Sequence, residues 1–392
     1  MQKKGLINTM KFICNKNKLH EAITNVSKAV PTKSNIAALE GIKISLSSSS
    51  LELTGYDLEL GIKTKIEAET EDTGEFVVNS RLLSEIIRKM SSEDVTISVD
   101  EKLNVNISGN NTKYDISAIP ADEYPDFPVI NNDESIDVPQ YILKNMIEHT
   151  NHAVSTSDNK PILTGELFDM ENNIFRMVAI DGFRLAVRTE PTAFSETKNF
   201  VVPSKTLNEI SKLLSRGDLS KQSSEENSDE NAASEELCHI YNDDKHIIFE
   251  ISGYYVVSRL LEGEFHNYKA SIPEDFKTEV VLKTRDFADS IERCSLLINE
   301  KNKCAVRCVF EDGTLSIDCK TNIGKINDQI SAEVCGEPIE IGFNNKFLLD
   351  ALKACETDQI KLQLIAPNRP VKIVPTAGDS FMYLLMPIQL RK

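Results

Sequence analysis

Three segments of the chain repeat one pattern of apolar and polar positions in the same order. Each segment starts with an apolar stretch typical of a strand, passes through a short polar residue, and ends in a stripe with apolar residues at i, i+3, i+4 and i+7, where Ser211 in the second copy is the one exception. The segments are 76–90 (FVVNSRLLSEIIRKM), 200–214 (FVVPSKTLNEISKLL) and 341–355 (IGFNNKFLLDALKAC). Chance can supply one amphipathic helix, but three in one register indicate an internal repeat.

The gap-free alignment of these segments matches charged and capping positions as well as apolar ones. In each copy a basic residue is followed four positions later by an acid: Arg81 and Glu85, Lys205 and Glu209, Lys346 and Asp350. Polar residues of the kind that cap helices stand before each stripe: Ser80, Ser204 and Asn345. Each copy is therefore predicted to place a strand end, a cap and an amphipathic helix in that order.

A second helix and several strands complete each predicted unit. Apolar stripes near 19–26, 143–147 and 287–294 mark the additional helices. Alternating stretches predict half-buried antiparallel strands: Ile42-x-Ile44-x-Leu46, Leu58-x-Leu60-x-Ile62, Val95-x-Ile97-x-Val99 and Tyr114-x-Ile116. The prediction is an α+β fold of three structurally repeated domains, each with two helices packed on antiparallel sheets.

Domain boundaries are predicted at two polar segments, 131–135 and 273–278. They give a first domain over 10–132, a second over 133–275 and a third over 276–392, with residues 1–9 as an extra N-terminal segment. The second domain holds an insert, 217–236, that is rich in Ser, Asn and Glu and has no aromatic residue. Such a segment has little apolar surface to bury and is predicted to be a disordered, acidic surface loop.

The formal net charge of −17 at first argues against contact with nucleic acid. The charge is unevenly distributed, however. Six predicted helical windows hold 18 of the 44 Lys and Arg residues but only 10 of the 61 Asp and Glu residues: 16–33, 81–90, 144–160, 205–216, 285–303 and 346–353. Positive helices in an acidic chain suit non-specific contact with phosphates, but Lys is also common on any solvated helix face. Charge alone does not separate these two interpretations.

Composition and motifs argue against several other classes of protein. No run of 18 apolar residues and no signal peptide occur, so no membrane partner is expected and the cytoplasm is the expected location. Eight scattered cysteines without a CxxC pair indicate buried, reduced thiols. No phosphate-binding loop, dinucleotide-binding turn, zinc-protease or hydrolase motif is present, so no enzyme, cofactor or metal is predicted. Asp57 and Asp181 occupy equivalent segments, where a carboxylate before a tight turn explains both better than acid–base catalysis.

Seven segments together resemble the bacterial DNA polymerase III beta subunit, or beta sliding clamp. They are MKFICNKNKL from Met10, LTGYDLEL, AVSTSDNKPILTGELF, VAIDGFRLAV, NEK at 299–301, IEIGFNNKFLLDAL and YLLMPIQL. The match runs in order from residue 10 to residue 390, and residues 1–9 lie outside it. The resemblance implies a DNA-clamp architecture, in which three similar domains form a crescent and two crescents dimerise head-to-tail into a ring around duplex DNA. Head-to-tail contacts that close on themselves produce such rings.

The resemblance also implies roles for particular residues. The family's DNA-contacting positions fall on Lys33, Arg81, Ser157, Asp158, Asn159, Lys160 and Lys205. Its peptide-binding slot falls on Leu163, Ile180, Gly182, Arg184, Leu185, Asn344, Phe347, Pro370, Leu384, Met386, Pro387 and Ile388. The dimer contact would pair Tyr114 and Ile116 with Leu296 and Leu297. At the rim of the slot the chain departs from the family's usual residues, with His266, Ala270 and Ser271.

The function implied by the resemblance is that of a polymerase processivity factor. Its partners would be double-stranded DNA, a second copy of the chain, replicative and repair polymerases, the clamp loader and other proteins with clamp-binding motifs. The main alternative is a peptide-binding scaffold that does not encircle DNA, which suits the acidic net charge. An enzyme built on repeated domains ranks third, because no catalytic constellation is visible. Retention on circular DNA and release from linear DNA separates the first two.

Overall fold

A computed structural model describes residues 10–70, 72–130, 134–157, 159–217, 236–299, 304–311 and 313–390. The predicted N-terminal segment 1–9, Asp158 and positions 218–235 of the acidic insert lie outside the described residues.

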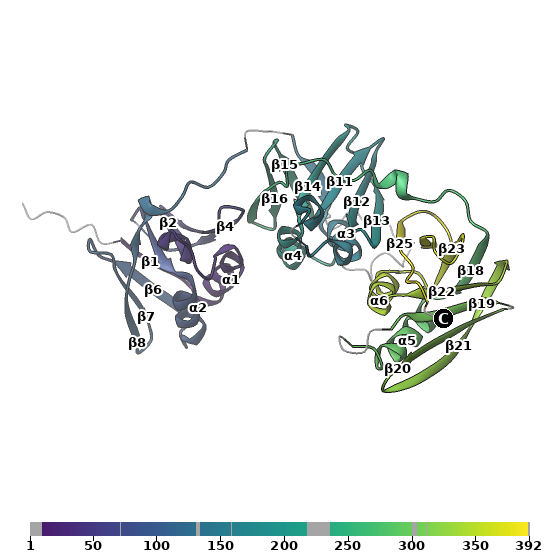
Figure 1. The fold of residues 1–392 in the computed structure, drawn as a ribbon. Helices are drawn as coiled ribbons and strands as arrows, with labels where there is room; N and C mark the ends of the chain where they lie inside the picture. Colours follow the sequence, from purple (N-terminus) through teal and green to yellow (C-terminus); the bar gives the residue numbers. More distant parts are fainter. Residues whose placement is uncertain are drawn as a thin grey trace, which may run out of the picture. The chain divides into compact units, whose positions relative to one another are not determined.

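The chain runs through one order of strands and helices three times (Figure 1). The first repeat contains β1 (Met10–Asn15), α1 (Lys16–Val26), β2 (Gly41–Ser47), β3 (Ser50–Tyr56), β4 (Leu60–Glu67), β5 (Gly74–Asn79), α2 (Ser80–Lys89), β6 (Asp94–Val99), β7 (Asn104–Gly109) and β8 (Thr112–Ser117). The second contains β10 (Ile136–Pro139), α3 (Gln140–Thr150), β11 (Gly165–Glu171), β12 (Ile174–Ile180), β13 (Arg184–Pro191), β14 (Lys198–Pro203), α4 (Ser204–Leu213), β15 (Leu237–Asn242), β16 (His246–Ile251) and β17 (Tyr254–Arg259). The third contains β18 (Thr278–Lys283), α5 (Thr284–Ser295), β19 (Val306–Glu311), β20 (Thr314–Thr321), β21 (Gly324–Gly336), β22 (Ile339–Phe343), α6 (Asn345–Lys353), β23 (Gln359–Leu364), β24 (Val371–Pro375) and β25 (Phe381–Leu385). A two-residue strand, β9 (Ile119–Pro120), follows the first repeat, and the predicted threefold repeat is confirmed.

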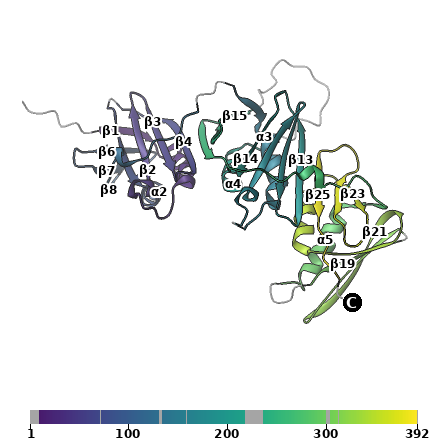
Figure 2. The same ribbon diagram turned by 45° about the horizontal axis from the view of Figure 1, so that its top comes forward.

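The chain divides into two compact units, Met1–Gln140 with Lys212–Leu260, and Tyr141–Ser211 with Leu261–Lys392. The first unit holds a sheet in the order β1-β6-β7-β8 and a second sheet in the order β10-β15-β16-β17-β4-β3-β2-β5-β9. The second unit holds one sheet in the order β14-β11-β12-β13-β25-β24-β23-β18-β21-β20-β19-β22. The strand pairs β17–β4 and β13–β25 therefore join neighbouring repeats, and the second of these pairs is visible in Figure 2.

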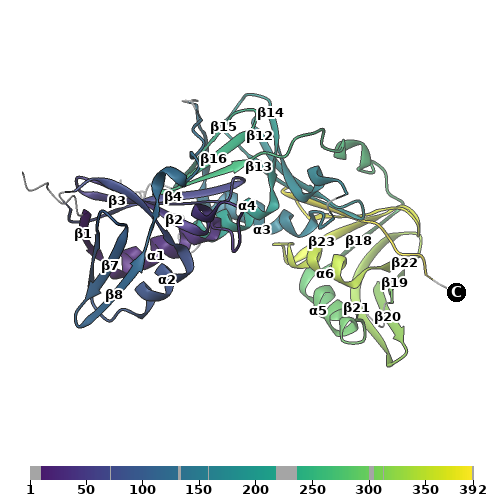
Figure 3. The same ribbon diagram turned by 60° about the vertical axis from the view of Figure 1, so that its left-hand side comes forward.

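The helices pack in pairs and bury their apolar stripes against the sheets. α1 lies beside α2, and α5 lies beside α6 (Figure 3). The stripe of α5 buries Phe287, Ile291 and Cys294, and that of α6 buries Leu348 and Leu352. Burying side chains of this size contributes roughly 1.5–3 kcal/mol each, which explains why the apolar spacing predicted these helices well.

Several predicted boundaries were wrong by a few residues. The side chains that cap α2 and α6 belong to Asn79 and Asn344, one position before the predicted Ser80 and Asn345. Leu58 lies in the turn before β4 with a φ of 75° and is 48% exposed, so it is not a strand residue. In each case the local hydrogen-bond geometry of a cap or turn, which periodicity does not report, decides the boundary.

The predicted helical windows also extended too far. α1 ends at Val26, α3 at Thr150 and α5 at Ser295, so Lys33 and Lys160 lie outside the helices that were expected to carry them. Five of the eight cysteines are buried as free thiols, namely Cys14, Cys238, Cys294, Cys308 and Cys319. None of the described helices has both the length and the apolar character needed to span a bilayer.

Candidate functional site

A cavity of about 540 Å³ lies in the second unit, beside the pairing of β13 from the second repeat with β25 from the third. Its lining is mainly apolar, with charged residues among it: Lys160, Ile162, Leu163, Ile180, Gly182, Phe183, Arg184, Leu185, Glu264, His266, Ser271, Pro370, Leu384 and Met386. Leu185 and Leu384 are directly opposite each other in the β13–β25 ladder. A cavity of this size with an apolar lining and a few polar groups suits a short peptide or a small molecule.

The turn between β12 and β13 forms one part of the cavity lining. Asp181 Oδ1 accepts hydrogen bonds from the backbone N–H groups of Phe183 (2.8 Å) and Arg184 (3.0 Å). Gly182 has a φ of 90°, which a residue with a side chain adopts only with strain. Asp57 accepts the matching pair of bonds from Glu59 and Leu60 in the first repeat. Both aspartates therefore shape turns, as the sequence predicts.

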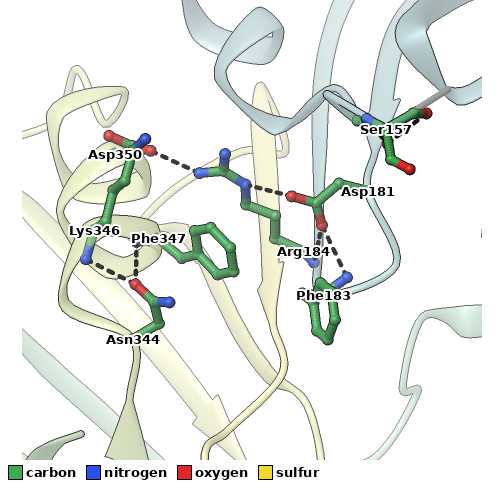
Figure 4. Close-up of polar contacts among 9 residues, drawn as sticks. Ser157, Asp181, Phe183, Arg184, Asn344, Lys346, Phe347 and Asp350 are labelled. Atoms are coloured by element: carbon green, nitrogen blue, oxygen red, sulfur yellow. Dashed lines mark hydrogen bonds and ion pairs between the residues drawn. The ribbon is translucent and has the colours of Figure 1, made fainter. Parts of the chain in front are cut away.

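The Arg184 side chain joins the second and third repeats next to this turn (Figure 4). Its Nε donates to Asp181 Oδ2 at 3.0 Å, and its Nη1 donates to Asp350 Oδ2 on α6 at 2.7 Å. The guanidinium also lies 4.3 Å from the centre of the Phe347 ring, and the side chain is only 9% exposed. A guanidinium with two carboxylates and an aromatic face is held firmly, because its planar donors fit these partners.

His152, a titratable residue near Arg184, is kept neutral. Burial, with a smaller contribution from the charge of Arg184, lowers the pKa of His152 to about 4. His152 contacts the Tyr383 ring edge-on at 5.7 Å between ring centres. At the cavity itself, His266 Nε2 and Ser271 Oγ form a hydrogen bond of 3.0 Å. Within the described ranges, no group of three or more His, Cys, Asp or Glu side chains is placed to hold a metal ion.

The structure brings eight of the twelve residues predicted for the slot into the cavity lining: Leu163, Ile180, Gly182, Arg184, Leu185, Pro370, Leu384 and Met386. Four others lie elsewhere in the second unit. Asn344 caps α6, Phe347 contacts Arg184, Ile388 pairs with Gly342, and Pro387 precedes Ile388 in the chain. Asn344 Oδ1 caps α6 by accepting hydrogen bonds from the backbone N–H groups of Lys346 (3.0 Å) and Phe347 (3.2 Å).

Sequence reasoning missed other lining residues; nothing singled out Glu264, but the rest had a signal. Phe183 is 63% exposed between two predicted slot residues, so its position alone pointed to the cavity. Ile162 is adjacent to the predicted Leu163, and His266 and Ser271 had been noted only as unusual residues at the rim. Lys160, predicted to contact DNA from the loop 157–160, also lines the cavity.

Comparison with known proteins identifies the family. Models of the N-terminal, central and C-terminal domains of the DNA polymerase III beta subunit match residues 10–128, 137–267 and 269–389. The beta sliding clamp of Bacillus subtilis is 32% identical over 394 residues, with 97% of this chain and all of the relative covered. That of Halalkalibacterium halodurans is 31% identical over 395 residues, with the same coverage. This chain belongs to the beta sliding clamp family.

Solved structures of family members share the fold. The crystal structure of the Bacillus subtilis sliding clamp superposes with a TM-score of 0.90 at 31% identity, covering 97% of this chain and 100% of that one. A DNA polymerase III beta subunit from Thermotoga maritima gives a TM-score of 0.84 at 26% identity, again covering 97% and 100%. The alternation of strands and helices described above is therefore the sliding-clamp fold.

The residues that the family resemblance assigned to DNA occupy exposed positions in the two units. Lys33 follows α1 in the first unit, and Arg81 is the second residue of α2. Lys205 has the equivalent position in α4 of the second unit. Ser157 and Asn159 lie in the loop before the cavity, where Asn159 N donates to Ser157 Oγ at 3.4 Å. Exposed cations at matching helix positions can meet a phosphate backbone without reading bases.

The residues assigned to the dimer contact lie on one strand edge and at one helix end. Tyr114 and Ile116 are on β8, which is the last strand of the four-stranded sheet of this clamp fold. Leu296 directly follows α5 and is 82% exposed, and Leu297 is half-buried beside it. A leucine this exposed is unusual on a protein surface, because its apolar side chain stays in water.

Proposed function

We propose that two copies of this chain close head-to-tail into a ring that encircles duplex DNA and tethers polymerases. The three domains of each copy would be 10–132, 133–275 and 276–392. Clients with Leu- or Phe-bearing motifs, among them polymerase subunits and the clamp loader, would bind in the 540 Å³ cavity. The ring catalyses no reaction. It acts in the cytoplasm by keeping a bound polymerase at high effective concentration on its template.

One observation carries the proposal: the chain already contains two strand pairs that join neighbouring repeats, and a ring requires a third pair of the same kind between copies. The last strand of the second repeat, β17, pairs with β4 of the first, and the last strand of the third, β25, pairs with β13 of the second. Within the described residues, the last strand of the first repeat, β8, pairs only with β7. Residues 324–331 of β21, the equivalent of β4 and β13, pair only with β20. Pairing β8 of one copy with residues 324–331 of β21 in another copy would form the third strand pair of this kind.

The two internal joints share one register, which fixes the register expected between copies. Arg259 N donates to Glu59 O at 2.8 Å, and Met386 N donates to Phe183 O at 2.8 Å. The equivalent bond would run from Ser117 N of one copy to Ile323 O of the other. This register sets Tyr114 opposite Ile326 and Asp115 opposite Lys325 of the second copy.

The side chains on these edges are complementary in that register. Tyr114 and Ile326 are both half-buried, while Asp115 and Lys325 are both exposed, so apolar groups meet on one face and opposite charges on the other. Ile116 would lie opposite Gly324, where an added Cβ would sit 3.4 Å from Leu297. The closeness of Leu297 to Gly324 supports the proposal that Leu296 and Leu297 cover the new pair, which the family resemblance implies.

Cross-linking tests the proposed joint. With Tyr114→Cys and Ile326→Cys in one chain, mild oxidation should give a covalent dimer on a non-reducing gel, because directly opposed residues of this kind are about 4.5 Å apart at Cα. The control, Tyr114→Cys with Asn327→Cys, puts the second thiol on the opposite face and should match the parent, which itself carries eight cysteines. Equal cross-linking of both pairs would refute this register, and a monomer by native mass spectrometry would favour a peptide-binding scaffold instead.

A further inference from the structure

The second helix of each repeat carries a basic residue with an acid four positions later, and this pairing has a consequence for DNA contact. In a helix, side chains at i and i+4 are neighbours, so the acid can neutralise the base. A neutralised cation is a weak ligand for phosphate. Whether the acid is engaged elsewhere therefore decides whether each cation is available.

In the first and third repeats the acid is engaged by another residue. Glu85 accepts a hydrogen bond of 2.7 Å from Arg88, one turn further along α2. Asp350 accepts one of 2.7 Å from Arg184, which comes from β13 of the second repeat. Among the described residues, no carboxylate forms an ion pair with Arg81 or Lys346, and both cations are exposed.

We propose that Lys346 contacts the DNA backbone in the third repeat and that Arg184 is a positioning residue that pairs with the Asp350 carboxylate, so that Asp350 does not form an ion pair with Lys346. The proposal rests on the proposed ring, since Lys346 is the repeat equivalent of Arg81 and Lys205 and was not among the residues assigned to DNA. Figure 4 shows the arrangement, with Asp350 turned to the Arg184 guanidinium and Lys346 on the preceding turn of α6.

The arrangement links the client cavity to the DNA contact. Arg184 lines the cavity, while its Nη1 holds the carboxylate that would otherwise face Lys346. Asp181 binds the Nε of the same guanidinium at 3.0 Å and keeps it in place. Removing Arg184 would release a carboxylate one helical turn from Lys346 and reduce the effective charge presented to phosphate.

Salt dependence of binding measures the contact directly. Each phosphate contact contributes about 0.9 to the slope of log affinity against log salt concentration. Between 50 and 200 mM salt, a variant that lacks one contact therefore loses about 3.5-fold less affinity than the parent loses. Lys346→Gln should show this loss on a short linear duplex, and Lys346→Arg should keep the parental slope. The control is Lys353→Gln on the same helix, because Lys353 already forms a 2.7 Å ion pair with Glu292. Equal slopes for Lys346→Gln and Lys353→Gln would overturn the contact.

The role of Arg184 needs a second pair of variants. Arg184→Gln should reduce the slope as Lys346→Gln does, and Arg184→Gln with Asp350→Asn should restore it, because no carboxylate is then released. A single Asp350→Asn variant keeps the Arg184–Asp181 pair and should bind as the parent does. A parental slope for Arg184→Gln, with native dimer mass and melting temperature, would overturn the positioning role.

Failure of the proposed ring would look different. In that case the parent itself would not be retained on nicked circular plasmid after loading, whatever the slopes of the variants on linear duplex. Retention of the parent together with unchanged slopes in every variant would leave the ring intact and remove only the role of Lys346.

Discussion

The carboxyl group of Glu166 is buried in the core of the second repeat, and its removal should stabilise the protein in a pH-dependent way. Alignment of the repeats sets Glu166 at the position of Ile42 in β2 and Val306 in β19, and all three side chains are 0% exposed. Thr150 Oγ1 donates to Glu166 Oε2, and Oε1 has no hydrogen-bond partner among the described residues. One repeat thus buries an acid where the other two bury hydrocarbon.

The size of the effect follows from the pKa of this group. Burial raises the pKa of Glu166 from 4.5 to about 8, against a smaller lowering by the Thr150 hydrogen bond. Because the folded-state pKa lies above the unfolded one, stability from this site is full below pH 4.5 and is lost as the pH rises toward 8. At 1.36 kcal/mol per pH unit, the loss between pH 5.5 and pH 8 is on the order of 3 kcal/mol.

Glu166→Gln removes the titration and keeps a group that can bond Thr150. Its free energy of unfolding, relative to the parent, should therefore rise by about 3 kcal/mol between pH 5.5 and pH 8. Urea unfolding followed by far-UV circular dichroism is the assay, since the chain has no Trp. Exposed Glu250, changed to Gln, is the matched control and should show no such trend. An equal difference between Glu166→Gln and parent at both pH values would refute the reasoning.

Three further predictions concern the interface, the insert and the cavity. Replacing Leu296 and Leu297 by Asp should give monomers in native mass spectrometry, because unpaired charge in an apolar contact costs several kcal/mol. A persistent dimer would show that the interface lies elsewhere. Deleting 219–234 should change the melting temperature by less than about 2 °C, because Leu219 and two alanines are the only apolar side chains the segment offers to bury, and loss of soluble protein would contradict this. Met386→Asp should weaken binding of a Leu/Phe-bearing client peptide at least about tenfold, or 1.4 kcal/mol, because Met386 lines the cavity and is 43% exposed. Fluorescence anisotropy measures the affinity, and the dimer mass should not change. An unchanged affinity would place the peptide elsewhere.

The repeat and its elements could be predicted from sequence because local periodicity determines them. The predicted stripes fall on real helices, with Met90 and Leu214 directly after α2 and α4 and Cys355 two positions after the end of α6. Eight of the twelve residues that the family resemblance assigned to a slot line the cavity, and periodicity singled out none of them for that role. Periodicity alone would have assigned the MPIQL segment to an ordinary terminal strand.

Other features depend on contacts between distant segments and could not be predicted. The i+4 spacing of Lys346 and Asp350 suggests a pair, yet Asp350 binds Arg184, which is 166 positions away in the chain. The burial of Glu166 was missed for another reason: strand alternation sets it on the face of Phe168 and Met170, but an acid at such a position is ordinarily expected to stay in water. Lys160 was assigned to a helix because the apolar spacing before it does not reveal that α3 ends at Thr150.

Topological retention tests the central claim, that two copies close around DNA, most directly. The Tyr114→Cys and Ile326→Cys chain is loaded onto nicked circular plasmid with a clamp loader and oxidised, so that both joints of the ring become covalent. The protein should then remain with the plasmid through denaturing detergent and high salt, and should be released when a restriction enzyme linearises the plasmid. Protein that leaves the intact circle in detergent, although it is fully cross-linked, would contradict the account, because a closed ring threaded by a circle cannot dissociate.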